Sequence, residues 1–319
     1  MAIAPSANVS KTYVIRRVGS RRDMNLSMIR AAMHVSRLLL LVLLAAWPAA
    51  AANPPPPPLD PIGGLPTDYK LVWADEFDEP GLPDPRRWAY DTERNREGWW
   101  NGEAQYYSAA RAKNARIKDG VLIIEAHRER LDPETHPDWG GQDYTSSRMT
   151  TNGRAEWTYG FIEVRAKLPC GRGSWAAIWT LGAPPHDYWP GGGEIDILEH
   201  VGYASGVAHA AVHTNRYNHT RRNARIAQTP VPDACDAFHT YQLHWTRDRI
   251  VIGVDGRNYY QFLNDHQGRR DSWPFDHPQY LLLNIAIGGG WGGNEGIDDE
   301  AFPMRMEVDY VRVYQHDPG

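Results

Sequence analysis

A strict alternation of apolar and charged side chains constrains this fold more than any other feature of the sequence. The alternation runs through residues 162–168 and again through residues 304–310. Neighbouring side chains of a β-strand point to opposite faces, so a period of two predicts antiparallel strands with one buried face. The pair Asp255-Gly256 follows another apolar run and is a strong hairpin signal. The sequence therefore predicts a single all-β domain, a sandwich or barrel, over residues 65–319.

The first 52 residues have the organisation of a targeting segment. Arg30 and Arg37 form a basic region, residues 38–47 form an apolar core, and the small residues up to Ala52 form a cleavage site. The apolar run is shorter than the roughly 18 residues that a membrane-spanning helix needs. We therefore expect a signal peptide that is cleaved near Ala52, and a secreted or periplasmic protein. The alternative interpretation is a buried amphipathic helix.

A proline-rich linker at residues 53–64 follows the targeting segment and supports that interpretation, because a run of prolines is extended. Met24, Met28 and Met33 are alternative starts of the chain. With any of them, residues 1–23 would be a misassigned extension.

The balance of charges excludes several classes of partner. The chain holds 34 Lys and Arg against 39 Asp and Glu, a formal net charge of −5. Residues 1–52 contain seven of the basic residues and one of the acidic residues, so the chain without them carries −11. An acidic protein does not attract phosphate backbones, sulfated polysaccharides or anionic membranes. We therefore expect a neutral ligand, no nucleic acid, no membrane association once the signal is removed, and a monomer.

Two cysteines, Cys170 and Cys235, are too few for a disulfide-rich scaffold, and they form no CxxC pair of the kind that holds structural zinc. In an exported protein, a single pair of cysteines usually forms a bridge. We expect a Cys170–Cys235 disulfide, and the alternative is two free buried thiols.

Three carboxylates lie close together in residues 194–199, directly after a triplet of glycines. In a regular strand, Glu194 and Asp196 share one face and Glu199 lies on the other. One extra residue, a β-bulge at residues 197–198, would bring Glu199 to the face of the other two acids. The apolar residues between the acids would then pack into the core.

Carboxylates this close cannot all ionise freely, so at least one pKa must rise. Retaining glycoside hydrolysis requires such a pair, one ionised and one protonated, at roughly 5–5.5 Å. In this interpretation Glu194 attacks the anomeric carbon, and Glu199 protonates the leaving oxygen and then activates water. Asp196 would form a hydrogen bond to the nucleophile. The alternative is a solvated acidic edge without a catalytic role.

The segment Glu-Ile-Asp-Ile-Leu-Glu resembles the E-x-D-x-x-E signature of glycoside hydrolase family 16, in the bulged form typical of its laminarinase-like β-1,3-glucanases. The non-bulged form E-x-D-x-E belongs to the lichenases. Further resemblances to the family follow in order along residues 71–78, 101–107, 159–165, 175–179, 284–291 and 308–314. The resemblance implies a concanavalin-like β-jelly roll, a sandwich of two curved antiparallel sheets with a concave substrate cleft. One departure is Ala176, where the family commonly has proline.

Trp175 and Trp179 are four residues apart and therefore share one face of a strand, with core tryptophan as the alternative. The resemblance implies that these two side chains line the sugar subsites. Trp291, which follows three glycines, is a third candidate platform for a sugar ring. By position in the family pattern, Asn101 and Arg148 are candidates for hydrogen bonds to sugar hydroxyls, with surface residues as the alternative.

His209 and His213 have a spacing that binds zinc on a helix, but their context predicts a strand, and we reject a zinc site there. The resemblance instead implies that His213 faces the cleft near the acid/base, with a structural histidine as the alternative. It also points to Glu76, Gly120 and Asp309 as ligands of a structural calcium ion away from the cleft, a use that suits oxygen donors. No cofactor is expected for catalysis.

These expectations combine into a secreted retaining glycoside hydrolase that cleaves a neutral, laminarin-like β-1,3-glucan. One alternative is a related enzyme of the family that acts on mixed-linkage glucan or agar-type galactan, or a transglycosylase. A non-catalytic glucan-binding lectin is disfavoured, because both Glu194 and Glu199 are present. The sequence leaves endo or exo action open.

Overall fold

The computed structural model describes residues 64–186 and 188–317. The predicted signal peptide and all but the last residue of the predicted linker lie outside these described residues. In the described part of the chain, we find no α-helix and four short 3-10 turns: η1 (Trp100–Gly102), η2 (Gly202–Ala204), η3 (His219–Arg221) and η4 (Asp299–Ala301). No helix of this part is long and apolar enough to cross a membrane.

The larger of two sheets has ten strands, in the order β15-β14-β13-β8-β17-β5-β6-β3, with β1 also on β17 and β4 also on β5. Its strands are β1 (Tyr69–Asp75), β3 (Gln105–Tyr107), β4 (Ala115–Lys118), β5 (Val121–Arg128), β6 (Tyr144–Ser146), β8 (Gly160–Lys167), β13 (His239–Trp245), β14 (Arg249–Val254), β15 (Arg257–Leu263) and β17 (Met304–His316). All pairs are antiparallel except β3 with β6.

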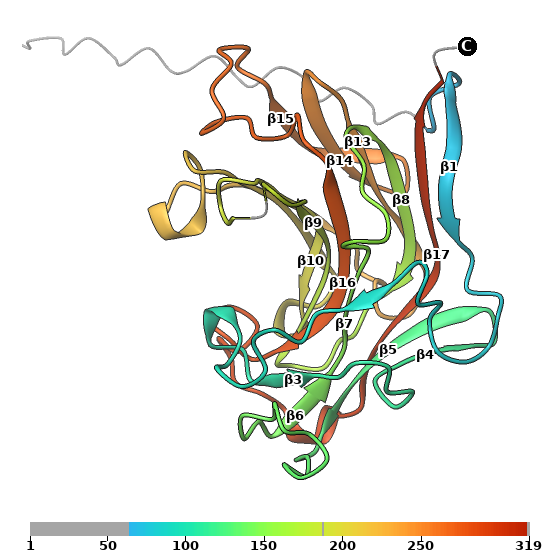
Figure 1. Ribbon diagram of the computed structural model, residues 1–319, viewed down its shortest axis with the longest axis vertical. Helices are drawn as coiled ribbons and strands as arrows, with labels where there is room; N and C mark the ends of the chain where they lie inside the picture. Colours follow the sequence, from blue (N-terminus) through green and yellow to red (C-terminus); the bar gives the residue numbers. More distant parts are fainter. Residues whose placement is uncertain (1–63, 187, 318–319) are drawn as a thin grey trace, which may run out of the picture. The chain divides into compact units, whose positions relative to one another are not determined.

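The smaller sheet has seven strands, in the order β12-β11-β10-β9-β16-β7-β2. Its strands are β2 (Ala89–Tyr90), β7 (Arg148–Thr150), β9 (Ser174–Gly182), β10 (Glu194–Val201), β11 (Val207–His213), β12 (Arg225–Pro230) and β16 (Gln279–Ile287). Figure 1 shows the two sheets as curved layers, with β9 and β10 on one side and β8, β17 and β1 on the other. The predicted two-sheet sandwich is confirmed.

The alternating strands have the buried faces that their sequences predict. Along β8, Ile162, Val164 and Ala166 are buried in the core between the sheets, while the charged residues between them are half-buried. The predicted hairpin joins β14 to β15 through Asp255 and Gly256, whose φ angles are 51° and 75°. Two positive φ angles are what a two-residue hairpin turn requires.

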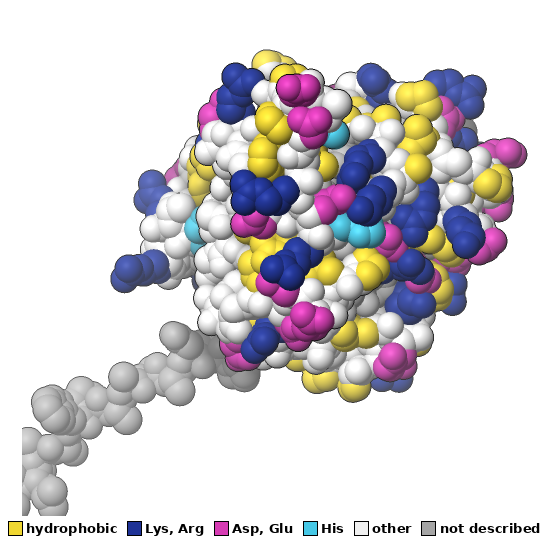
Figure 2. Space-filling model, turned by 90° about the horizontal axis from the view of Figure 1, so that it is seen from below, with side chains coloured by type: hydrophobic (Ala, Val, Ile, Leu, Met, Phe, Trp, Pro, Cys, Tyr) yellow, Lys and Arg dark blue, Asp and Glu magenta, His cyan; other side chains and the backbone are white. Residues whose placement is uncertain are grey.

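The outer surface carries charges of both signs. On the face drawn in Figure 2, Lys and Arg side chains are interspersed with Asp and Glu side chains.

The predicted β-bulge is present on β10. Asp196 lies opposite Trp179 of β9, and Leu198 lies opposite Ile178, so Ile197 is the extra residue. Ile197 and Leu198 are both fully buried in the core. Two consecutive apolar side chains can enter the same core because the bulge interrupts the pleat.

The predicted disulfide is also present, between Cys170 in the connection from β8 to β9 and Cys235 in the segment before β13. The Cα atoms of the two residues are 5.8 Å apart, within the usual range for such a bond.

We expect Ile197→Ala to lower the free energy of unfolding by about 2–5 kcal/mol, because it removes fully buried methyl groups and leaves a cavity at the bulge. The matched control is Ile226→Ala, since Ile226 is 71% exposed and its truncation should change the free energy by no more than about 0.5 kcal/mol. Urea denaturation of both variants measures the difference. Equal losses of unfolding free energy in the two variants would show that the bulge is not anchored in the core.

Candidate active site

The bulge brings the three acids of β10 to one face of the smaller sheet. On the neighbouring strand β11, His213 lies opposite Glu194 and His209 lies opposite Glu199. Residues directly opposite in an antiparallel pair point to the same side, so the two histidines share the face of the acids. Asp196 lies between the two glutamates and is only 2% exposed, while Glu194 and Glu199 are half-buried.

The carboxylate of Glu194 accepts a hydrogen bond from Nε1 of Trp189, a residue in the loop before β10. The glycines at positions 191–193 allow this loop to pack closely on itself. A Cβ atom on Gly192 would lie 1.9 Å from the carbonyl oxygen of His186, so no residue with a side chain could replace this glycine without a shift of the loop. Trp189 itself is 40% exposed, and its ring centre lies 5.1 Å from that of His219. The loop thus presents an exposed indole beside Glu194.

Glu199 lies in an aromatic enclosure. Nε1 of Trp175 donates a hydrogen bond to Oε1 of Glu199, at 2.9 Å. The ring of Trp175 meets that of Trp291 edge to face at 5.4 Å, and Trp291 meets His209 at 4.9 Å. Burial raises the pKa of Glu199 well above its usual value, and the negative charges of Asp196 and Glu194 raise it further. The Trp175 hydrogen bond acts in the opposite direction, because it favours the ionised carboxylate.

The environment of Asp196 favours its protonated form. Its burial raises the pKa of this carboxyl well above the usual value, and both the charge of Glu194 and a hydrogen bond to Glu194 raise it further. Nε2 of His213 lies 3.4 Å from Oδ2 of Asp196. A protonated Asp196 can donate a hydrogen bond to the carboxylate of Glu194.

Trp179 and the side chains beneath it complete the floor of the site. Nε1 of Trp179 donates to Oδ1 of Asn284 at 2.8 Å, and Asn284 in turn donates to the hydroxyl of Tyr107. The guanidinium of Arg148 lies 4.7 Å from the Trp179 ring centre. Arg148 is buried, and its Nε lies 3.0 Å from a carboxylate oxygen of Asp91. Its contacts are thus those of a residue that positions Trp179.

Asn101 is exposed and has a left-handed backbone conformation with φ 61°. Its carbonyl oxygen accepts a hydrogen bond from the backbone N–H of Gly290 at 2.8 Å. The two segments that carry Asn101 and Trp291 are therefore tied together. Trp291 is half-buried, as are Trp175 and Trp179.

Sequence reasoning missed Trp189, Asn284 and Glu103. Burial raises the pKa of Glu103, which accepts a hydrogen bond from Gln105 at 3.0 Å. A signal for Trp189 was present, since it is an aromatic residue next to a glycine-rich loop, as Trp291 is. Asn284 lies within an apolar run, and only the register of β16 with β9 shows that it lies near Trp179.

Within residues 64–186 and 188–317, two groups of three side chains bring potential metal-binding atoms within 4.8 Å of one another. One is Glu194, Asp196 and His213, at the site itself; the other consists of the two cysteines and His200. His209 and His213 lie on a strand, as predicted.

The residues predicted to bind calcium have other partners. Arg312 donates two hydrogen bonds to Glu76, and Arg165 donates one to Asp309. Gly120 lies in the turn between β4 and β5. Carboxylates engaged by guanidinium groups do not match the free oxygen ligands that calcium needs. Calcium binding stays a prediction, without support from this arrangement.

The sequence model of the glycosyl hydrolases family 16 matches residues 102–312. The chain belongs to this family. This family-16 chain is 49% identical over 256 residues to a β-glucanase of Rhodothermus marinus, a match that spans 77% of the chain and 85% of the relative. The chain is therefore a glycoside hydrolase.

Two solved structures resemble the family-16 chain closely. The first is SCLam, a non-specific endo-β-1,3(4)-glucanase, with 53% identity, a TM-score of 0.78, and coverage of 81% of this chain and 95% of that one. The second is the laminarinase of Rhodothermus marinus, with 49% identity, a TM-score of 0.73, and coverage of 77% and 97%. The predicted membership of the laminarinase-like branch is thereby confirmed.

We expect Trp175→Phe to raise the pKa of Glu199 further, because it removes the donor that favours the ionised carboxylate. The sequence predicts that Glu199 is the general acid, which must be protonated to act, so the alkaline limb of the kcat/KM profile should move to higher pH, by about one unit for one charge-assisted hydrogen bond. The control is Trp291→Phe, since Trp291 contacts Trp175 through its ring. Identical profiles for the two variants would show that Trp175 does not tune this group.

Proposed function

We propose that this family-16 chain is a retaining endo-β-1,3-glucanase with Glu194 as nucleophile and Glu199 as acid/base. The observation that carries the proposal is the difference between the environments of the two glutamates. Glu194 accepts a hydrogen bond from the exposed indole of Trp189, whereas burial and neighbouring charges raise the pKa of Glu199 well above its usual value. One ionised and one protonated carboxyl are what the first step of retaining hydrolysis requires.

In the first step, the Glu194 carboxylate attacks the anomeric carbon and Glu199 transfers its proton to the departing glycosidic oxygen. A glycosyl ester on Glu194 and a shortened glucan result. In the second step, the ionised Glu199 takes a proton from water, which attacks the anomeric carbon and releases Glu194. Asp196 donates to Glu194 while that residue is ionised, and this hydrogen bond orients the attacking oxygen.

The substrate we propose is a neutral β-1,3-glucan. The half-buried rings of Trp175, Trp179 and Trp291 can stack on the apolar faces of sugar rings. The excess of acidic residues disfavours sulfated polymers. The solved relatives named above are a laminarinase and an endo-β-1,3(4)-glucanase. Because the latter is described as non-specific, mixed-linkage glucan is the second candidate substrate.

We expect Glu194→Gln to abolish product release from laminarin, because an amide cannot form the glycosyl ester. Glu199→Gln should lose roughly 10²–10⁴-fold on laminarin, the usual contribution of a general acid. The same variant should form its glycosyl-enzyme readily from an aryl glycoside, whose leaving group needs no proton. Product chromatography and release of the aryl group measure both effects.

The matched control is Glu300→Gln, an exposed glutamate in η4, which should keep full activity. Full activity of Glu194→Gln on laminarin would contradict the proposed mechanism. Products from agarose but not from laminarin or lichenan would leave the proposed mechanism unchanged and would show that the substrate is an agar-type galactan. Binding of laminarin by the wild-type chain without any product would favour the lectin alternative.

A further inference from the structure

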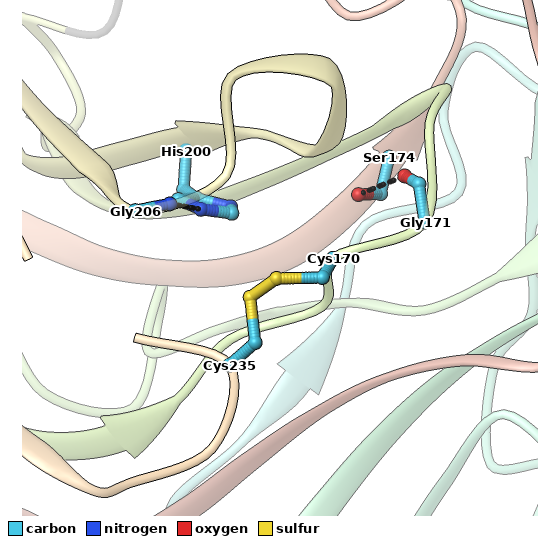
Figure 3. The surroundings of a disulfide bond; sticks show 6 residues. All are labelled: Cys170, Gly171, Ser174, His200, Gly206 and Cys235. Carbon is cyan, nitrogen blue, oxygen red and sulfur yellow. Dashed lines mark hydrogen bonds between the residues drawn. A yellow bond between two sulfur atoms is a disulfide. The ribbon is translucent and has the colours of Figure 1, made fainter. Parts of the chain in front are cut away.

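The disulfide lies beside the C-terminal end of the catalytic strand. Cys170 precedes β9, Cys235 precedes β13, and His200 directly follows Glu199 on β10. Figure 3 shows the two cysteines and His200 in one neighbourhood. One ring nitrogen of His200 and the two sulfur atoms all lie within 4.8 Å of one another. Three segments that are far apart in the sequence thus bring metal-ligating atoms together.

His200 has no function in the mechanism described above, and its imidazole is poorly satisfied. The side chain is fully buried, and its Nδ1 has no hydrogen-bond partner among the described residues. Nε2 accepts a hydrogen bond from the backbone N–H of Gly206 at the long distance of 3.4 Å. Buried polar atoms are normally hydrogen-bonded, and an unpartnered one calls for an explanation. An imidazole nitrogen beside two sulfur atoms suits a metal ion.

The backbone holds the three residues in place independently of the bond between the sulfur atoms. The N–H of Leu168 donates to the carbonyl of Ala234 at 2.8 Å, which ties the two cysteine segments together. The N–H of Val231 donates to the carbonyl of Gly206 at 2.8 Å, which ties the Cys235 segment to the turn that follows β10. After reduction, the two thiols therefore stay beside His200.

We propose that Cys170, Cys235 and His200 form a binding site for a soft divalent cation, such as zinc, when the disulfide is reduced. Two thiolates and one imidazole are ligands that zinc prefers, with a fourth position left for water. Cys170 is exposed, so an ion can reach the site from solvent. The bound ion replaces the disulfide as the cross-link between the two cysteine segments. Through His200, the ion also joins strand β10 to these segments.

The metal site forms in two stages, reduction of the disulfide and then binding of the ion. A dithiol reductant transfers two electrons and two protons to the Cys170–Cys235 disulfide and is itself converted to a disulfide. The metal ion then displaces both thiol protons to solvent and binds the two thiolate sulfurs together with the lone pair of a His200 ring nitrogen.

The test uses the full chain, reduced with dithiothreitol, desalted without oxygen and titrated with Co²⁺ as a spectroscopic substitute for Zn²⁺. We expect one equivalent to bind with a thiolate-to-cobalt charge-transfer absorption, which Zn²⁺ then removes by displacement. The oxidised chain should lack this absorption. His200→Ala should weaken Co²⁺ binding by about tenfold or more, because loss of even a residue that only hydrogen-bonds to a metal ligand typically lowers metal affinity at least tenfold.

The matched control is His244→Ala, a half-buried histidine on β13 that should leave Co²⁺ affinity unchanged. Cys235→Ser should abolish the charge-transfer absorption. Absence of this absorption in the reduced wild-type chain overturns the proposal, and this outcome does not depend on the folding of any variant. Binding of equal strength by the oxidised chain also overturns it and points instead to Glu194, Asp196 and His213. None of these results depends on the proposed activity.

Discussion

The extra residue in β10 is the constraint on which the rest of the site depends. The bulge at Ile197 brings Glu199 to the face that already holds Glu194 and Asp196. It also directs Ile197 and Leu198 into the core, where both are fully buried. The same irregularity therefore anchors the strand and aligns its acids. A regular pleat over the same six residues would bury Glu199 in the apolar interior, at a cost of several kcal/mol for an unpaired charge.

Burial of the acids on β10 has a cost in stability. The pKa values of Asp196 and Glu199 are both raised well above their usual values, chiefly by burial. At pH values between the ordinary and the raised pKa, the folded chain therefore holds protons that the unfolded chain has released. The stability that this proton binding contributes is fully present below the ordinary pKa of a carboxyl and is lost as pH rises through the raised values. Burial of Asp196 and Glu199 thus favours their protonated forms at the expense of stability at higher pH.

Much of the fold could be predicted from the sequence, because alternation and turn residues act locally. The alternating run at 162–168 corresponds to β8, and the hairpin at Asp255-Gly256 is present. Contacts that depend on distant segments could not be predicted. The position of Arg148 between Asp91 and the Trp179 ring is one example, because strands far apart in sequence meet there, and its role toward sugar hydroxyls stays a prediction. The Trp189 contact with Glu194 likewise depends on how a whole loop folds back.

The central claim is that Glu194 attacks the sugar directly while Glu199 acts as acid and then as base. The stereochemistry of the first product tests this claim most directly, because two successive displacements restore the original configuration. Proton NMR during the first minutes of laminarin cleavage, before the released ends mutarotate, shows which anomer forms. The account predicts the β-anomer. Initial formation of the α-anomer would mean a single displacement by water and would contradict the account.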